Sequence, residues 1–441
     1  MQRYAYNKLM EWKNTPDEKR KPLILEGARQ VGKTWLAREF GQREFDSFVE
    51  INFEESENLR MVFESDFDIN RILLNIQAVS GKKIEPGKTL IFFDEIQHAH
   101  RGLLSLKYFK ERAPEYHLVA AGSLLGVIDH ADDSFPVGKV DFLRVMPFSF
   151  EEFLMAMGKE GLVDVLHSLD PVSINASGSQ LEYLLRQYYY VGGMPEAVKT
   201  FVESSDYKAV RKVQNAILKS YEYDFSKHPP KEIVKRMQLL WNAIPSQLAK
   251  ENRKFVYSAV RSGARARDFE TAIQWLCDAG MAYKVTRATA GELPLDGFVD
   301  MDSFKLYVLD VGLHGAMSGL SAQSLVEGDA FYKQYKGALT EQFVLQELRL
   351  LEETKIHYWS PDTGIAEVDF VVQVGDKVVP IEVKSEQNLR AKSLRVFLSR
   401  YQVPLAVRCS MAPMSLGGAV AELPLYAITL IPSILMGGSK I

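Results

Sequence analysis

Residues 27–34 read GARQVGKT, in which a glycine and a Gly-Lys-Thr triplet are separated by four residues. The stretch follows the apolar run PLILE at 22–26 and precedes WLAREF at 35–40, which has the composition of a helix. A strand, a glycine-rich turn of this spacing and a helix together form a phosphate-binding loop. The loop amides and the helix N-terminus favour negative charge. The stretch therefore predicts a site for a nucleoside triphosphate, taken to be ATP, directly after a first strand.

The residue types inside this loop suit particular tasks. Gly27 and Gly32 adopt backbone conformations closed to other residues and let amides approach the phosphates. Lys33 reaches the β- and γ-phosphates as a cation, and Thr34 places its hydroxyl on Mg²⁺. The residues predicted to bind the nucleotide are Gly27, Ala28, Arg29, Gln30, Val31, Gly32, Lys33, Thr34 and Ser123.

An acidic pair about sixty residues downstream completes the predicted nucleotide site. The apolar strand TLIFFDE at 89–95 ends in Asp94 and Glu95. Asp94 is expected in the water shell of Mg²⁺, and Glu95 is expected to orient or deprotonate the attacking water. Ser123 ends the strand HLVAAGS, where related ATPases place a polar residue that senses the γ-phosphate. Plain solvation of a strand end and a serine in a turn are the alternative interpretations.

The chain is long enough, at 441 residues, for two to four domains. Strand-like and helix-like segments alternate from 22 to about 150, which predicts a parallel sheet covered on both faces. Apolar residues then recur at helical spacing from 151 to about 250. Residues 254–288, with a returning strand within 297–310, predict a winged helix-turn-helix. The predicted domains are an ATPase domain at 1–155, a helical lid with the winged helix at 156–325, and a small α/β domain at 326–441.

The chain resembles the bacterial and archaeal AAA-type ATPases that carry a C-terminal domain of unknown function. The resemblance rests on GARQVGKT, FFDEIQ (92–97), AAGS (120–123), FPVGKVDFLRVMPFSFEEFL (135–154) and GGMPEA (192–197). It implies an α/β P-loop parallel sheet followed by the helical, winged-helix and C-terminal domains. Family members often have Gly-Arg where this chain has Gly138-Lys139. A charge there could reach a γ-phosphate in cis or from a neighbour, so a homo-oligomer is one arrangement that the sequence allows.

The segment AEVDFVVQVGDKVVPIEVKS at 366–385 carries a second chemical signal. Glu382 and Lys384 point to one face of a strand, and Asp369 approaches Glu382 if the two strands form a hairpin around GDK. Two carboxylates on Mg²⁺ with a lysine beside a phosphate are what metal-assisted phosphodiester hydrolysis needs. The segment resembles the restriction-endonuclease-like PD-(D/E)xK fold, and Glu341 on the preceding helix matches its additional acidic residue. A nucleic-acid or protein-docking module that kept these residues is the alternative.

The predicted chemistry therefore involves two groups of residues. The predicted catalytic residues are Glu95, Lys33, Asp369, Glu382 and Lys384. The predicted metal ligands are Thr34, Asp94, Glu341, Asp369 and Glu382.

Charge and composition limit which partners and which cellular location the sequence predicts. The whole chain has a formal charge of −4, but residues 205–290 contain sixteen Lys and Arg against eight Asp and Glu. Arg261, Arg265 and Arg267 cluster before the predicted recognition helix, so this block is expected to contact DNA or RNA. Protein contacts or a rigid lid are the alternative. Two distant cysteines, no apolar signal segment and no run of membrane-spanning length predict a cytoplasmic protein.

Two classes of function follow. In the first, ATP hydrolysis drives a nucleic-acid-associated machine that contains the winged helix and the nuclease-like domain. In the second, a signalling or scaffold ATPase changes partners with its bound nucleotide, and the nuclease-like domain is an inactive docking module. A chaperone or protease partner is a third, less favoured, hypothesis because the sequence carries no peptidase signature.

Overall fold

The structure is a computed structural model that describes most of the chain. It describes residues 3–55, 57–99, 101–122, 136, 138–225, 231–250, 254–327, 330–351, 354–362, 366–385 and 392–436. The chain divides into two compact units, each considered by itself below. The N-terminal unit comprises Gln2–Met146 with Asp278–Gly280, and the C-terminal unit comprises Pro147–Cys277 with Met281–Ile441.

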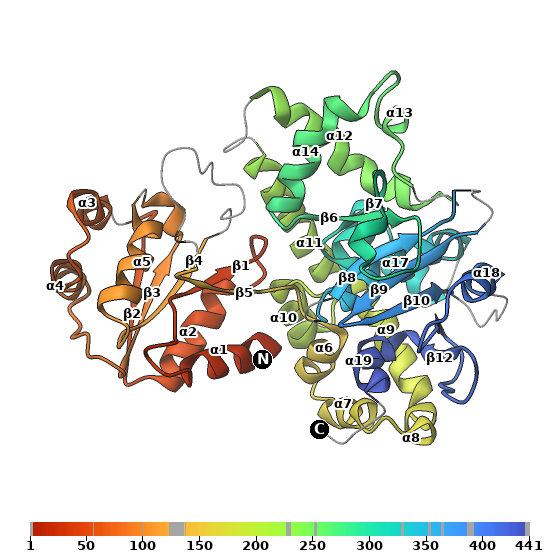
Figure 1. Ribbon diagram of the computed structural model, residues 1–441, viewed down its shortest axis with the longest axis horizontal. Helices are drawn as coiled ribbons and strands as arrows, with labels where there is room; N and C mark the ends of the chain where they lie inside the picture. The colour runs from red at the N-terminus through yellow and green to blue at the C-terminus, as the bar shows by residue number, and fades with distance from the viewer. Residues whose placement is uncertain are drawn as a thin grey trace. The chain divides into compact units, whose positions relative to one another are not determined.

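The N-terminal unit is an α/β domain with a parallel sheet, as the alternating sequence pattern predicts. Its five strands lie in the order β2-β3-β4-β1-β5, and every pairing is parallel (Figure 1). The strands are β1 (Leu23–Glu26), β2 (Ser47–Asn52), β3 (Thr89–Asp94), β4 (His117–Ala121) and β5 (Asp141–Arg144). The helices are α1 (Tyr4–Lys13), α2 (Lys33–Glu44), α3 (Glu57–Ser65), α4 (Ile69–Ser80), α5 (Gly102–Arg112) and the short 3₁₀ helix η1 (Ile96–His98).

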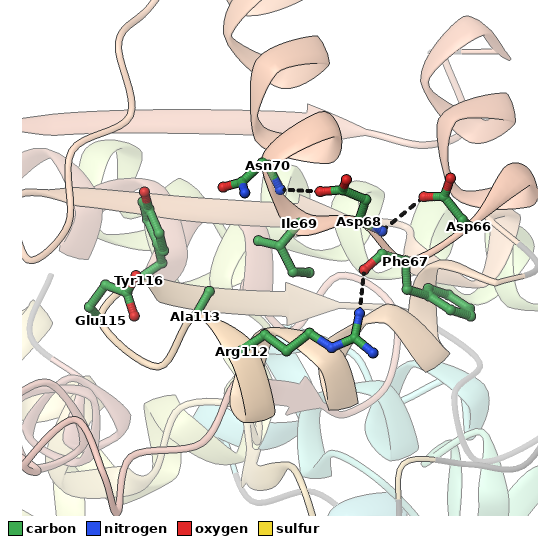
Figure 2. Close-up of a pocket in the computed structure, with 9 residues that line it drawn as sticks. All are labelled: Asp66, Phe67, Asp68, Ile69, Asn70, Arg112, Ala113, Glu115 and Tyr116. Atoms are coloured by element: carbon green, nitrogen blue, oxygen red, sulfur yellow. Dashed lines mark hydrogen bonds between the residues drawn. The ribbon is translucent and has the colours of Figure 1, made fainter.

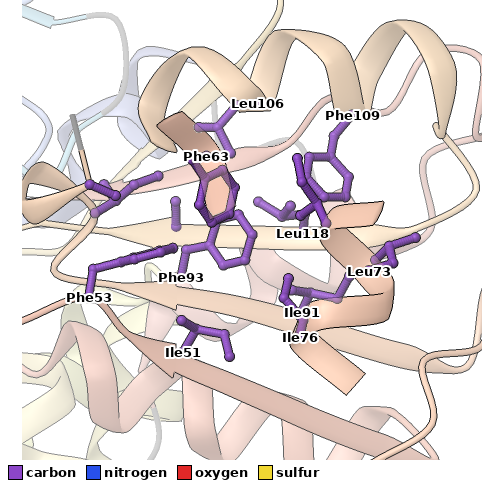
Figure 3. Close-up of a cluster of buried hydrophobic side chains, with 14 of the residues drawn as sticks. Ile51, Phe53, Phe63, Leu73, Ile76, Ile91, Phe93, Leu106, Phe109 and Leu118 are labelled. Atoms are coloured by element: carbon purple, nitrogen blue, oxygen red, sulfur yellow. The ribbon is translucent and has the colours of Figure 1, made fainter. Parts of the chain in front are cut away.

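Aromatic side chains fill the core between this sheet and helices α3, α4 and α5. Phe53, Phe63 and Phe93 are fully buried and meet edge to face, with ring centroids 5.3 to 5.7 Å apart (Figure 3). Such edge-to-face pairs add to the stabilisation from burial alone. Because Phe93 immediately precedes Asp94, this core fixes the end of the strand that carries the predicted acidic pair.

The C-terminal unit begins with helices and continues into a mixed α/β region. Its helices are α6 (Phe150–Ala156), α7 (Glu160–His167), α8 (Pro171–Ala176), α9 (Gly178–Val191), α10 (Pro195–Ser204), α11 (Tyr207–Asp224), α12 (Lys231–Leu248), α13 (Tyr257–Val260), α14 (Ala266–Asp278), α15 (Val311–Met317), α16 (Ala322–Glu327), α17 (Ala330–Leu348), α18 (Lys392–Arg400), α19 (Ile431–Leu435), and the 3₁₀ helices η2 (Leu295–Phe298) and η3 (Leu425–Leu430). No helix in the described part of the chain is both long and apolar enough to cross a membrane.

One seven-stranded sheet joins the second and third predicted domains. Its strands lie in the order β12-β11-β10-β9-β8-β6-β7 (Figure 1). They are β6 (Ala282–Ala288), β7 (Val299–Val308), β8 (Thr354–Trp359), β9 (Val368–Val374), β10 (Lys377–Val383), β11 (Val407–Ser410) and β12 (Ala421–Pro424). The hairpin β6–β7 follows three helices, in the order predicted for a winged helix, but β6 also pairs in parallel with β8. The winged-helix assignment and the boundary at 325/326 stay predictions.

The motif GGMPEA provides a close backbone contact to a buried carboxylate. Asp310 has no exposed surface and accepts hydrogen bonds from the amide of Gly193 at 2.6 Å and from that of Leu313 at 2.9 Å. A Cβ atom added to Gly193 would lie 2.1 Å from the carbonyl oxygen of Phe148. Glycine is therefore required where the turn between α9 and α10 packs closely against neighbouring backbone.

Candidate functional site

The loop at 27–32 has the backbone conformations that its glycines predict. Gly27, Gln30 and Gly32 all have positive φ angles, of 139°, 66° and 95°. A Cβ atom on Gly27 would lie 2.2 Å from the carbonyl oxygen of Val145, so the close approach excludes a side chain. Helix α2 begins directly after Gly32 and presents its N-terminus to the loop. This is the arrangement of amides that favours a bound phosphate.

Lys33 is buried against the loop that precedes it. Its Nζ atom donates hydrogen bonds to the carbonyl oxygens of Gly27 and Ala28, both at 2.8 Å, and the residue is 8% exposed. Burial lowers the pKa of the Lys33 ammonium to about 8, although the charges of Glu95 and Asp94 oppose this shift. The side chain is therefore held across the loop with its charge partly desolvated.

Thr34 and Asp94 come together from two different elements. The Thr34 hydroxyl, in the first turn of α2, donates to Asp94 Oδ2 at the end of β3 over 2.9 Å. Strand β4 lies between β1 and β3, so the loop and the acidic pair meet across one strand at the carboxyl edge of the sheet. Burial raises the pKa of Asp94 above its usual value, and the Thr34 hydrogen bond opposes this shift. A hydroxyl and a carboxylate are hard oxygen donors and fit Mg²⁺.

Glu95 follows in a conformation that non-glycine residues rarely adopt. Its φ and ψ angles are 50° and 45°, and its amide donates to Asp94 Oδ1 at 3.1 Å. Gln97, for which the sequence motifs indicate no role, donates from its side-chain amide to Glu95 Oε2. Residues held in sparsely populated backbone regions cluster at functional sites. The turn therefore orients the Glu95 carboxylate beside Asp94 and Lys33.

The sequence suggests two further candidates for this site, Ser123 and Lys139. Ser123 lies outside the described residues. Lys139 forms an ion pair with Glu111, with 2.9 Å between Nζ and Oε1. A role at a γ-phosphate would require Lys139 to leave this partner.

The predicted hairpin of the C-terminal unit is present. Strands β9 and β10 pair in antiparallel fashion around Gly375, with Ile381 opposite Phe370. One step further along this antiparallel register lie Glu382 on β10 and Asp369 on β9. Asp369 Oδ2 accepts a hydrogen bond from the amide of Val383 at 2.8 Å. The hairpin therefore brings the two predicted carboxylates to the same end of the sheet.

Glu382 and Lys384 form a contact within this pair of strands. Lys384 Nζ lies 2.6 Å from Glu382 Oε1, and Glu382 is 4% exposed. Its other oxygen, Oε2, is buried and has no hydrogen-bond partner among the described residues. Burial and the charge of Asp369 raise the pKa of Glu382 to about 7, and Lys384 opposes this shift. A buried carboxylate oxygen without a donor is an available ligand atom for a cation.

Glu341 is held by strand β7. It is 2% exposed, and its Oε2 accepts from the Tyr307 hydroxyl at 3.1 Å. Lys305 Nζ lies 3.9 Å from the same oxygen and 2.7 Å from Glu367 Oε1. The sequence motifs do not indicate Lys305 or Glu367; the one signal for Lys305 is a lone lysine inside the apolar strand SFKLYVLD. Within the described residues, no three His, Cys, Asp or Glu side chains converge on one metal position.

A cavity of about 380 Å³ lies elsewhere in the N-terminal unit (Figure 2). It is lined by Asp66, Phe67, Asp68, Ile69, Asn70, Arg112, Ala113, Glu115 and Tyr116. The segment 115–116 precedes β4, so this cavity lies toward the amino edge of the parallel sheet, whereas loop 27–32 follows the carboxyl end of β1. None of the predicted site residues lines it.

Comparisons with known families assign the N-terminal unit. The family described as "AAA domain" matches residues 19–154. Two families described as domains of unknown function, DUF8612 and DUF4143, match residues 182–324 and 336–427. A comparison with curated proteins finds no match. Residues 19–154 therefore match an AAA domain, as the motifs predict, and the restriction-endonuclease-like assignment stays a prediction.

Solved structures that resemble the chain include three proteins of low sequence identity. The Walker-type ATPase PABY2304 of Pyrococcus abyssi is 15% identical, with a TM-score of 0.43, over 71% of this chain and 94% of that chain. PCH-2 of C. elegans is 16% identical, with a TM-score of 0.24, over 38% of this chain and 48% of that chain. A DNA replication initiation factor is 13% identical, with a TM-score of 0.28, over 62% of this chain and 77% of that chain.

Proposed function

We propose that the protein binds ATP with Mg²⁺ at loop 27–34 and hydrolyses it. The observation that carries this proposal is the 2.9 Å hydrogen bond between Thr34 and Asp94, which places two hard oxygen donors beside the phosphate loop. Mg²⁺ held by these residues would neutralise negative charge on the bound phosphates. Lys33 adds a second positive charge on the loop side. Glu95, oriented by Gln97, is the group that accepts a proton from the attacking water.

ATP binding by the wild-type protein is expected to weaken as the pH rises through 8. The Lys33 ammonium binds phosphate only in its charged form, and burial lowers its pKa to about 8. If the bound phosphates keep it charged, affinity falls by about tenfold per pH unit above that value. Titration of a fluorescent ATP analogue between pH 7 and 9.5 measures this. Lys110→Ala should retain the pH profile, whereas Lys33→Ala should bind weakly at every pH. A wild-type affinity independent of pH would contradict the role given to Lys33.

We also propose that the C-terminal unit contacts nucleic acid through helix α14 and the turn before it. The apolar face of α14 is buried, including Phe269, Ile273 and Trp275. Arg267 and Gln274 are exposed on its other face. Arg261 and Arg265 are exposed in the preceding turn. The arginines of this face can bind the phosphates of a duplex, and its polar side chain can enter the groove.

Removal of these cations is expected to change the salt dependence of DNA binding. Each arginine that neutralises a phosphate contributes about one unit to the slope of log affinity against log salt. Arg265→Ala combined with Arg267→Ala should therefore lower the slope by about two, as measured by fluorescence anisotropy with a labelled duplex. Arg186→Ala, at a surface ion pair on α9, is the matched control. An unchanged slope, or no binding at any salt concentration, would favour the scaffold ATPase.

A second candidate activity is metal-dependent phosphodiester cleavage at Asp369, Glu382 and Lys384. The buried Oε2 atom of Glu382, which has no hydrogen-bond partner in the described part of the chain, favours it, because the hairpin leaves a ligand atom beside a second carboxylate. Mg²⁺ or Mn²⁺ held there would polarise a scissile phosphate. Lys384 would lie beside that phosphate as a cation.

Asp369→Asn is expected to lower plasmid nicking by at least about 100-fold in the presence of Mg²⁺ or Mn²⁺. Nicking is followed by the conversion of supercoiled plasmid on agarose gels. Asp376→Asn, in the turn of the same hairpin, should leave the rate unchanged. Equal nicking by wild type and Asp369→Asn would mean a contaminating nuclease or another site.

A further inference from the structure

Lys305, on strand β7, is a fully buried cation among the carboxylates of the C-terminal unit. It is 0% exposed, and its Nζ atom lies 2.7 Å from Glu367 Oε1. The contact has the distance of an ion pair, but its angles are not those of a hydrogen bond. A buried ammonium is costly unless opposite charges compensate it. Its position therefore requires nearby carboxylates that remain charged.

The same strand also holds Glu341. Lys305 and Tyr307 are two residues apart and so point to one face of β7. The Tyr307 hydroxyl donates to Glu341 Oε2 at 3.1 Å, and Lys305 Nζ lies 3.9 Å from that oxygen. The centroid of the Tyr358 ring lies 5.0 Å from the same ammonium. Glu341 is thus engaged by β7 through a hydrogen bond and a positive charge.

The charge of Lys305 also acts on Glu382, whose ionised form it favours. Four carboxylates, those of Glu341, Glu367, Asp369 and Glu382, are therefore associated with two ammonium groups, those of Lys305 and Lys384. When all four carboxylates are ionised, two negative charges remain, and one divalent ion neutralises them. A second divalent ion would meet the Lys305 ammonium at close range, where like charges repel strongly.

We propose that Lys305 is a built-in cation of this cluster, which pairs with Glu341 and Glu367 and leaves Asp369 and Glu382 to bind a single divalent ion. The inference rests on the proposed metal-dependent site and sharpens it. It changes the role of Glu341, which the sequence pattern predicts to be a metal ligand. Glu341 is instead a positioning residue that holds Lys305 against the cluster.

Mn²⁺ binding to the full-length chain tests this proposal. Asp94→Asn is included in every sample so that the nucleotide site does not contribute, and binding is measured by isothermal titration and by the loss of the free Mn²⁺ signal in electron paramagnetic resonance. This background should bind one Mn²⁺, and added Asp369→Asn should abolish the binding. Added Glu341→Gln should change the dissociation constant by less than about threefold, because Glu341 is not a ligand. Added Lys305→Met should tighten binding at least about tenfold, whereas Lys305→Arg should not.

The outcomes distinguish the two levels of the proposal. A loss of Mn²⁺ affinity of about tenfold or more in Glu341→Gln would make Glu341 a ligand and overturn the role given to Lys305. Unchanged affinity in a folded Lys305→Met variant would overturn it as well. If Lys305→Met does not fold, as circular dichroism would reveal, the Glu341→Gln result decides. The remaining outcome is that Asp369→Asn leaves Mn²⁺ binding unchanged both in the background with Lys305 and in the one with Lys305→Met. That result would overturn the metal-dependent site itself, and the inference with it.

Discussion

Replacing Glu95 by Gln is expected to lower ATP turnover by about 10²- to 10⁴-fold while ATP still binds. The substitution keeps the size of the side chain but removes the base that accepts a proton from the attacking water. The Lys33 ammonium and the Thr34–Asp94 pair, which serve binding, stay in place. Turnover is measured by phosphate release with saturating ATP and Mg²⁺, and binding is measured with a fluorescent analogue.

Two further variants separate the loss of chemistry from the loss of binding. Lys33→Ala should lose affinity as well as turnover, because the loop then lacks its cation. Glu115→Gln, at the amino edge of the same sheet, removes an acid far from the phosphate loop and should leave both quantities unchanged. Normal ATP hydrolysis by both Glu95→Gln and Lys33→Ala would rule out the assignment of this nucleotide site.

The arrangement of loop 27–34 and the acidic pair could be predicted from the sequence because its parts are local. Residues 27–34 form one continuous turn, and Asp94 and Glu95 end one continuous apolar strand. The contact between Thr34 and Asp94 follows from the parallel sheet, which brings the carboxyl ends of its strands to one edge. The contribution of Gln97 could not be predicted, because it depends on the left-handed turn at Glu95.

The C-terminal cluster could be predicted only in part. The hairpin that brings Asp369 toward Glu382 follows from the spacing around GDK. Lys305 belongs to a hairpin that resembles the wing of a separate domain, and nothing in its local sequence indicates that β6 pairs with β8. That pairing places β7 in the same sheet as the carboxylate hairpin. Long-range pairing of this kind is set by the burial of whole faces, which local periodicity does not encode.

The GGMPEA motif shows the same limit. It marks a turn in the sequence, but Asp310, the carboxylate that accepts from the amide of its second glycine, lies 117 residues further along the chain. Asp310 also begins helix α15 as its N-terminal cap and lies 3.4 Å from the side-chain amide of Gln346 on α17. A single buried carboxylate therefore connects the turn after α9 with α15 and α17.

Asp310→Ala is expected to lower the free energy of unfolding of the C-terminal unit by about 2–6 kcal/mol. The substitution leaves the buried amides of Gly193 and Leu313 without their acceptor, at about 1–3 kcal/mol for each unsatisfied donor. Urea unfolding followed by tryptophan fluorescence measures the loss. Asp302→Ala, at an exposed position on β7, is the matched control and should change stability by less than about 0.5 kcal/mol. Equal stability of the two variants would refute the structural role given to Asp310.

The pH dependence of stability provides an independent test of the same carboxylate. Burial raises the pKa of Asp310 to about 6 in the folded state, whereas its pKa in the unfolded chain is near 4. Between about pH 4 and pH 6 the folded state therefore binds more protons than the unfolded state. The stabilising contribution of protonation is therefore fully present below about pH 4 and is lost as the pH rises through 6. Relative to Asp310→Asn, the free energy of unfolding of the wild-type protein should fall by up to about 3 kcal/mol between pH 4 and pH 6. Above about pH 6 the difference between the two proteins should stay constant. A difference between the two proteins that does not change from pH 4 to pH 7 would mean that Asp310 is ionised throughout, its charge held by the amides of Gly193 and Leu313.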